Sequence, residues 1–213
     1  MSTVTAILSD VELETLGREI AATMGGDWSC RLDKDRETDR VWGIILANGK
    51  GEAFEIRRDW REKGKLNVHG VYPRGGKGGK GTATTGECWG QNVKRYQEHL
   101  PTIQVSASRK PSAIAADIAR RFLPGYLEVL ARAIAAKAQA ETSHDAREAT
   151  LARLLAACPS LRRSNQPNSQ ECYFAGETSG SVKVGHDADV SITLNYIPAD
   201  LAEKILAIVG GAE

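Results

Sequence analysis

The sequence predicts an α+β protein: an N-terminal helix, an antiparallel meander sheet, a helical middle and a smaller strand–strand–helix lobe at the C-terminus. Three observations support this fold class. A capped amphipathic stretch opens the chain, short apolar segments separated by turn residues fill 28–72, and prolines at 111 and 198 each precede an amphipathic stretch. The 213 residues, 41% hydrophobic and 26% charged, can bury a core and argue against wholesale disorder.

The first expected helix begins after Ser9. Ser9 and Glu12 have the spacing of a capping box, and Leu8 and Leu13 stand where a hydrophobic staple needs them. The residues that share its apolar face are Leu13, Leu16, Ile20 and Met24. The glycine pair at 25–26 should end the helix.

Alternating apolar residues predict an antiparallel meander over 28–72. The expected strands are 28–32, 41–47, 52–58 and 66–72. The charged stretch 33–40, DKDRETDR, contains no apolar residue, so we expect a solvated loop there. Asn48-Gly49 predicts a two-residue hairpin turn with positive φ at both positions.

The middle of the chain is expected to be helical. After a strand over 102–107, Pro111 stands at the first position of a helix, which proline favours. Pro124-Gly125 should break or sharply kink this helix, so that 126–138 and 145–158 form two further helical pieces. The polar stretch 159–170, which contains two prolines, is typical of a linker.

The C-terminal part is predicted to form short strands followed by a helix. The expected strands are 172–175, 181–184 and 190–196, and the helix begins at Pro198. We therefore expect an α+β domain over 1–140 and a helix plus small α/β lobe over 141–213, either separate or packed on the same sheet. Apolar residues follow Pro111 and Pro198 at equal offsets, which fits either a duplicated strand–helix unit or the ordinary spacing of amphipathic helices.

Several classes of protein are disfavoured by composition. The sequence contains no run of 18 apolar residues, which a membrane span would need. Its N-terminus lacks the basic and apolar regions of a secretory signal. The four cysteines form no C-x-x-C pair, which is typical of reduced thiols in a cytoplasm. We expect no cofactor, no membrane and no catalytic motif, and the sequence leaves the oligomeric state open.

The net charge of +1 conceals a basic middle segment. Residues 51–100 carry ten basic and six acidic side chains, whereas residues 1–50 and 151–213 are net acidic. Between residues 63 and 86 there is no acidic residue, and the cations there are Lys63, Lys65, Arg74, Lys77 and Lys80. Such a segment can concentrate a polyanion even when the whole chain is nearly neutral.

The glycine-rich stretch 73–86 is a candidate phosphate-binding loop. It is not a Walker loop, because no Ser or Thr follows Lys77 or Lys80 directly and no helix pattern follows. A loop that clamps a phosphate backbone and a solvated hairpin tip explain the residues equally well. Tyr72 and Trp89 flank this stretch, where they could either stack on bases or lie half-buried at the sheet margin.

A second group of cations lies around the expected helix after Pro111. Arg109 and Lys110 stand at its start, where positive charge opposes the helix dipole unless an anion binds there. Arg120 and Arg121 lie ten and eleven residues after Lys110 and could join the loop lysines in one basic face, or could simply be solvated.

A third candidate is the stretch Gly185-His186-Asp187-Ala188-Asp189. His186, Asp187 and Asp189 are residue types that ligate metals, with Glu177 as a possible addition across the hairpin. A polar turn explains the same residues without a metal. A metal-dependent hydrolase is therefore the third functional hypothesis.

The segment 105–126, VSASRKPSAIAADIARRFLPGY, resembles a stretch found in uncharacterised accessory proteins of bacteriophages, prophages and plasmids. The resemblance implies a mobile-element protein that works in a bacterial cytoplasm, and it carries over no catalytic residue. Together with the basic residues, it predicts a binding protein rather than an enzyme, with nucleic acid or a host nucleoprotein complex as its partner. The alternative is a protein–protein inhibitor of a host defence system, such as a CRISPR effector or a restriction enzyme.

Overall fold

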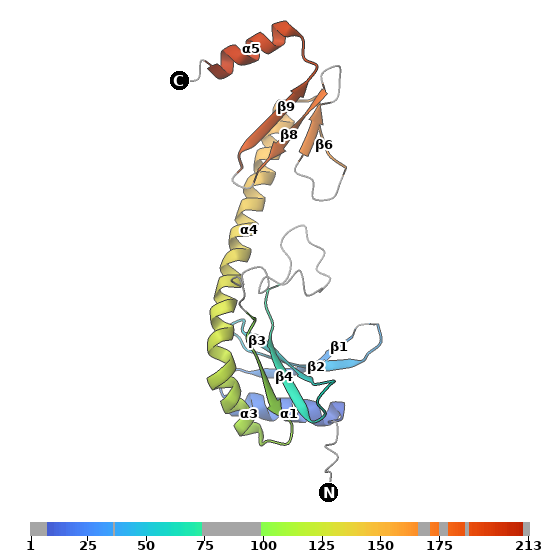
Figure 1. Ribbon diagram of the computed structural model, residues 1–213, viewed down its shortest axis with the longest axis vertical. Helices are drawn as coiled ribbons and strands as arrows, with labels where there is room; N and C mark the ends of the chain where they lie inside the picture. Colours follow the sequence, from blue (N-terminus) through green and yellow to red (C-terminus); the bar gives the residue numbers. More distant parts are fainter. Residues whose placement is uncertain are drawn as a thin grey trace. The chain divides into compact units, whose positions relative to one another are not determined.

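The computed structural model describes residues 8–35, 37–73, 99–165, 171–174, 179–185 and 188–210 (Figure 1). The chain forms two compact units, the first extending through Lys137 and the second beginning at Ala138. Helices and antiparallel sheets occur in both, so the α+β class is confirmed. Whether the lobe expected over 141–213 folds by itself stays a prediction.

The first helix, α1 (Asp10–Met24), forms as its capping residues predict. The Ser9 hydroxyl accepts a hydrogen bond from the Glu12 backbone N–H, and the Glu12 carboxylate accepts one from the Ser9 backbone N–H at 2.7 Å. Leu13 and Ile20 are fully buried on its inner face. A Cβ at Gly17 would collide with Ile44, so this glycine permits the close approach of α1 to the sheet.

The first unit contains a five-stranded antiparallel sheet in which consecutive strands are neighbours, as the meander predicts. The strands are β1 (Ser29–Lys34), β2 (Val41–Ala47), β3 (Ala53–Arg58), β4 (Lys65–Gly70) and β5 (Thr102–Ser106). Their alternation places apolar residues on the face covered by helices and polar residues such as Arg31, Asn67 and Gln104 on the other.

The β2–β3 hairpin is confirmed, but the expected two-residue turn is wrong. Asn48 N–H bonds to Glu52 O at 3.0 Å, so three residues form the turn, and the positive φ falls at Gly51 (+82°) rather than at 48 and 49. The Asn48 side-chain oxygen accepts from the N–H groups of Lys50 and Glu52, both at 3.1 Å. This local bonding favours the longer turn over the primed one.

The expected break at Pro124-Gly125 is also wrong. The helix α3 (Pro111–Asp117) continues through a π-helical turn, η1 (Ile118–Phe122), into α4 (Leu123–Ala157) without interruption. The wider π turn directly before Pro124 accommodates the ring and its missing N–H. No glycine or proline occurs from Tyr126 to Ala157, so the two further helical pieces form one helix.

The core of the first unit lies between the sheet and α1, α3, η1 and the start of α4. An aromatic group occupies its centre, with the Phe122 and Tyr126 rings stacked at 5.3 Å and Phe54 edge-on to Phe122 at 5.7 Å. The Tyr126 hydroxyl donates to Val71 O and accepts from Ala53 N–H, both at 3.0 Å. These hydrogen bonds fix the first turn of α4 against the sheet.

The second unit contains a four-stranded antiparallel sheet, one strand more than the sequence predicts. Its strands are β6 (Leu161–Arg163), β7 (Glu171–Phe174), β8 (Ser179–Val184) and β9 (Val190–Asn195), and β6 lies within the stretch expected to be a linker. Leu151 of α4 packs with Leu161, Cys172, Val182 and Val184 in a small core. Arg163 and Glu148 form a two-point ion pair at 2.7 and 2.9 Å.

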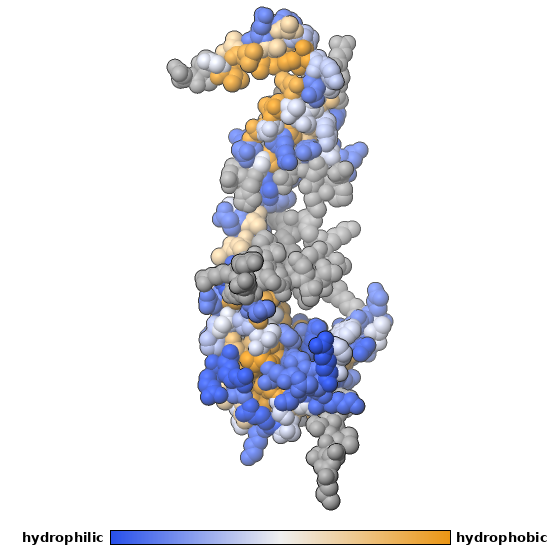
Figure 2. All heavy atoms as spheres, viewed as in Figure 1, coloured by the Kyte–Doolittle hydropathy of each residue, from blue (hydrophilic) through white to orange (hydrophobic). Residues whose placement is uncertain are grey.

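The last helix, α5 (Ala199–Gly210), begins one residue after Pro198, whose carbonyl accepts the first helical hydrogen bonds. None of its residues is buried. Leu206, Ile208 and Val209 are 69–75% exposed, and apolar atoms run along this helix in Figure 2. The apolar stripe expected from the sequence therefore exists, but none of its residues is buried.

Candidate functional site

One end of the five-stranded sheet gathers most of the described cations that the sequence singled out. Because the strands alternate in direction, the β1–β2 turn, the β3–β4 turn and the β5–α3 loop all lie at this end. We call it the basic end and define it by these residues: Lys63, Lys65, Arg109, Lys110, Arg120 and Arg121. The chain leaves the sheet at Pro73 and returns at His99 at the opposite end.

The β3–β4 turn is held by the carboxylate of Asp59. It accepts hydrogen bonds from the backbone N–H groups of Glu62 (3.0 Å) and Arg61 (2.7 Å) and from the side-chain amides of Asn67 and Gln104, both at 2.9 Å. The bond from Glu62 contributes most, and together these donors lower the pKa of Asp59 to about 2. The turn that carries Lys63 is thereby fixed.

The β3–β4 turn and the β5–α3 loop are direct neighbours. Lys65 lies opposite Ser106 in the sheet register, and Ala107 N–H donates to Gly64 O at 2.9 Å. Residues of both segments, including Lys63, Lys65 and Ala107, line one small hollow. The turn that carries Lys63 and the start of β4 at Lys65 therefore adjoin the loop that carries Arg109 and Lys110.

Three arginines converge on one carboxylate, that of Asp117 at the end of α3. Arg109 forms a hydrogen-bonded ion pair with it, and Arg120 and Arg121 approach it at 3.3 and 3.6 Å. The Arg109 hydrogen bond is the main reason that the pKa of Asp117 is lowered. The Asp117 side chain is only 8% exposed, whereas those of Arg109, Arg120 and Arg121 are 43%, 77% and 49% exposed.

This arrangement leaves a surplus of positive charge at the surface. Asp117 neutralises one of three guanidinium groups, and Lys110 beside them is exposed. The buried carboxylate orients several exposed arginines. Their planar guanidinium groups present N–H donors of the kind that bind phosphate oxygens. The arginine cluster of Arg109, Arg120 and Arg121 is the part of the basic end best suited to a polyanion.

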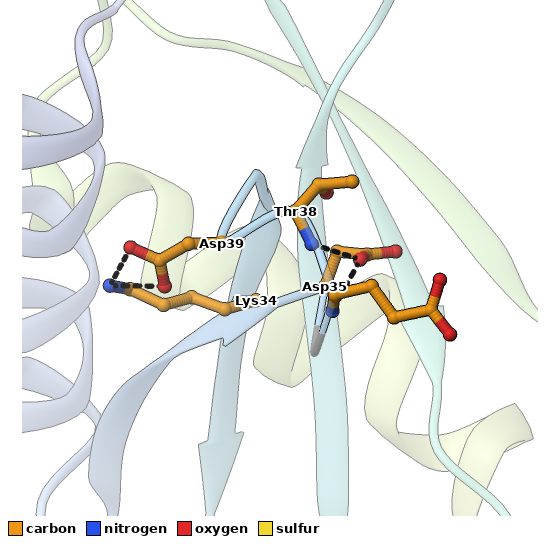
Figure 3. A network of polar contacts seen from close by, with 5 residues as sticks. Lys34, Asp35, Thr38 and Asp39 are labelled. Atoms are coloured by element: carbon orange, nitrogen blue, oxygen red, sulfur yellow. Dashed lines mark hydrogen bonds and ion pairs between the residues drawn. The ribbon is translucent and has the colours of Figure 1, made fainter.

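The acidic β1–β2 turn, part of the loop expected over 33–40, does not neutralise the basic end through ion pairs in the described residues. Asp39 pairs with Lys34 at 3.1 Å, and Asp35 accepts from the N–H groups of Glu37 and Thr38 at 2.9 Å (Figure 3). Asp33 instead pairs with Arg57 at 3.6 Å on the outer face of the sheet. Asp35 and Asp39 therefore bond within their own hairpin, and Asp33 bonds to the neighbouring strand β3.

Lys63 and Lys65 are the cations of the basic segment that lie in the described part of the chain. Lys63 and Lys65 lie at the start of β4, while the segment with Arg74, Lys77 and Lys80 joins the chain at the opposite end of that strand. Those three residues and Trp89 lie outside the described part of the chain. The expectation that they share one basic island with Lys63 and Lys65 therefore stays a prediction.

Tyr72 is not a base-stacking surface in this structure. Its side chain is 5% exposed and its ring lies 5.5 Å from that of Tyr126 within the core. The sequence pattern could not separate a half-buried margin residue from a core residue here. Of the two readings, burial at the sheet margin is the one that holds for Tyr72.

Two exposed tryptophans at the basic end escaped the sequence analysis. Trp60, in the β3–β4 turn, is 81% exposed, and the guanidinium of Arg61 lies 4.5 Å from its ring centroid. Trp42, at the start of β2, is 44% exposed, with Arg40 at 4.8 Å. A tryptophan within the polar run Asp-Trp-Arg-Glu-Lys of 59–63 was the available signal, since such a run predicts an exposed turn.

A group of ionisable residues on the outer face of the sheet was also missed. Glu55 is nearly buried, and burial raises its pKa although it accepts a hydrogen bond from Arg57. His69 lies opposite Glu55 in the register, and burial lowers its pKa. No described residue adds to these two side chains the nucleophile or the convergent ligands of a catalytic site.

The described residues contain no site that would support the metal hypothesis. His186, Asp187 and Glu177 lie outside the described residues, and Asp189 belongs to the β8–β9 turn, where its carbonyl accepts from Gly185 N–H at 2.8 Å. Among the described residues no group of three metal-ligating side chains occurs. None of the described helices combines the length and apolar character needed to cross a membrane.

Comparison with protein-family models, with curated proteins and with solved structures finds no match to this chain. The resemblance of 105–126 to mobile-element proteins therefore stays a prediction.

Proposed function

We propose that this is a non-enzymatic nucleic-acid-binding protein whose basic end contacts the phosphate backbone, alone or within a host nucleoprotein complex. The observation that supports it most is the arginine cluster, in which three largely exposed guanidinium groups share one buried carboxylate. The fixed β3–β4 turn adds Lys63 beside it. An origin in a phage or other mobile element belongs to the same proposal.

The shared Asp117 favours binding in two ways. It holds the guanidinium groups near one another, which lowers the entropy cost of engaging a phosphate. It also leaves most of their N–H donors free, because one carboxylate cannot satisfy three forks. Phosphate contacts of this kind give affinity and orientation without reading sequence.

The test is a salt titration of binding to a duplex of random sequence, followed by fluorescence anisotropy. Each phosphate contact contributes a slope of roughly −0.9 to the plot of log affinity against log salt concentration. We expect Arg120→Gln with Arg121→Gln to reduce the slope by about 2. The double variant Arg18→Gln with Lys50→Gln is the control, since it removes the same charge from α1 and from the opposite end of the sheet.

An unchanged slope in the Arg120/Arg121 variant, or an equal change in the control, would contradict the proposal. Melting curves of both variants check that folding is intact, because all four side chains are exposed.

A protein–protein inhibitor of a host defence system is the second candidate. The exposed Trp60 and its partner Arg61 favour it, since Trp and Arg are the residue types most often found at the energetic centre of protein interfaces. Stable copurification with one host complex, abolished by Trp60→Ala and insensitive to nuclease, would place this function first.

A further inference from the structure

We infer that the preferred ligand is single-stranded nucleic acid, with bases stacked on Trp60 and Trp42 while the backbone runs over the basic end. This inference rests on the proposed function and adds the strandedness of the ligand. It is carried by the two exposed indole rings, which the phosphate-binding argument does not use.

Trp60 presents a flat apolar surface to solvent. One ring face is covered by the Arg61 guanidinium at 4.5 Å, and an 81% exposure leaves the remaining surface open. The turn that carries it is held by four hydrogen bonds to Asp59, so the backbone beneath the ring is already ordered. A base stacking on this ring would form an Arg–indole–base sandwich, in which the cation also strengthens the interaction.

Trp42 lies on the next strand at the same end. Gly43 pairs with Arg57 in the sheet register. Trp42, one residue before Gly43, therefore lies beside the end of β3, where the turn that carries Trp60 begins. The guanidinium of Arg40 lies 4.8 Å from the centroid of its ring. Neighbouring strands are about 4.8 Å apart, so the backbone segments that carry the two rings adjoin at one end of the sheet.

Aromatic rings of this kind distinguish single strands from duplexes. The bases of a duplex stack on one another and present only their edges in the grooves, whereas an unpaired base offers its face. Lys63 lies in the same turn as Trp60, and the loop with Arg109 and Lys110 adjoins it through the Ala107–Gly64 hydrogen bond. Backbone charge and base faces can therefore be met together.

The experiment compares an oligo-dT of about 20 nucleotides with a duplex of equal length, by anisotropy at fixed salt. We expect the wild-type chain to bind oligo-dT more tightly than the duplex. Trp60→Leu should weaken oligo-dT binding roughly 5- to 150-fold, the loss of one stacked base, and leave duplex binding within about twofold. Trp60→Phe, which keeps a ring, should retain most of the affinity.

Tyr196→Leu is the matched control, since it removes a 94% exposed aromatic side chain from the second unit. Melting curves of Trp60→Leu verify folding, because so exposed a side chain adds little to the core. Equal losses for oligo-dT and duplex, or no loss for oligo-dT, would overturn the inference while the Arg120/Arg121 slope still supports phosphate binding. Failure of both ligands to bind would overturn the proposed function itself.

Discussion

Single carboxylates organise the basic end of this protein. Asp117 gathers three arginines, and Asp59 ties a turn to β4 and β5 through amide and backbone donors. Both acids are ionised and hydrogen-bonded, but they act in opposite senses. The Asp59 carboxylate accepts hydrogen bonds from neutral donors and fixes the geometry of the β3–β4 turn. The Asp117 carboxylate is shared by three arginines whose side chains remain exposed.

The lowered pKa of Asp59 makes a prediction about pH. Its folded-state pKa of about 2 lies below the reference value of 3.8, so the ionised group stabilises the fold above pH 4, and this stabilisation is lost as the pH falls towards 2. Asp59→Asn should lower the melting temperature at pH 7 and lower it progressively less between pH 4 and pH 2. Thermal melting across this range measures the difference.

Asp39→Asn is the comparison, because Asp39 is 82% exposed in a surface ion pair and should matter little at any pH. A deficit of Asp59→Asn that stays constant from pH 7 to pH 2 would show that the charge of Asp59 is not what holds the turn.

At the scale of elements, the β2–β3 turn shows how side-chain hydrogen bonds select a turn type. Gly51 has φ of +82°, and a Cβ at Gly49 would collide with the carboxylate of Asp27, which accepts from Gly49 N–H at 2.7 Å. The two glycines are thus required for different reasons, conformation at Gly51 and space at Gly49.

Gly51→Val should destabilise the protein by about 1–2 kcal/mol, because a β-branched residue is strained at positive φ. Lys50→Val, one position earlier and at an ordinary φ, should change stability by less than about 0.5 kcal/mol. Chemical denaturation of both variants gives the comparison. Equal effects would indicate that the turn adopts another conformation in solution.

The helices illustrate a different balance. The η1 turn lets one continuous helix pass Pro124, although proline in a regular α-helix interior removes a hydrogen bond and clashes with the preceding turn. By contrast, α5 has a strong apolar stripe but buries none of its residues. A sequence pattern therefore identifies an amphipathic helix without showing whether its apolar face is covered.

At the scale of the whole molecule, the buried apolar side chains of the described residues form two hydrophobic cores. The larger is built on the five-stranded sheet, and the smaller includes Leu151, Leu161 and Val182. Because each unit has a core of its own, we expect the two to unfold in separate transitions.

Leu151→Ala should lower the free energy of unfolding in one transition, and Ile56→Ala should lower it in the other. Each loss should be roughly 2–5 kcal/mol, since both side chains are fully buried. Differential scanning calorimetry with denaturant unfolding checks this. A single transition shifted equally by both variants would show that the units unfold together.

The sequence by itself determined the local elements of this protein. The Ser9 cap, the alternating strands of the meander and the helix at Pro111 each depend on contacts between residues close in the chain, so periodicity and capping chemistry were enough. It also identified Arg109, Lys110, Arg120 and Arg121 as a group of cations. What local pattern could not supply was which cations meet.

The tertiary structure decided the site. It separated Lys63 from the attachment of the glycine-rich segment, buried Tyr72, exposed Trp60 and brought three arginines to Asp117. These outcomes depend on strand direction and register, which reverse the chain at every turn and place residues far apart in sequence at one end of a sheet. Burial and charge pairing follow from that geometry, and no short stretch of sequence encodes it.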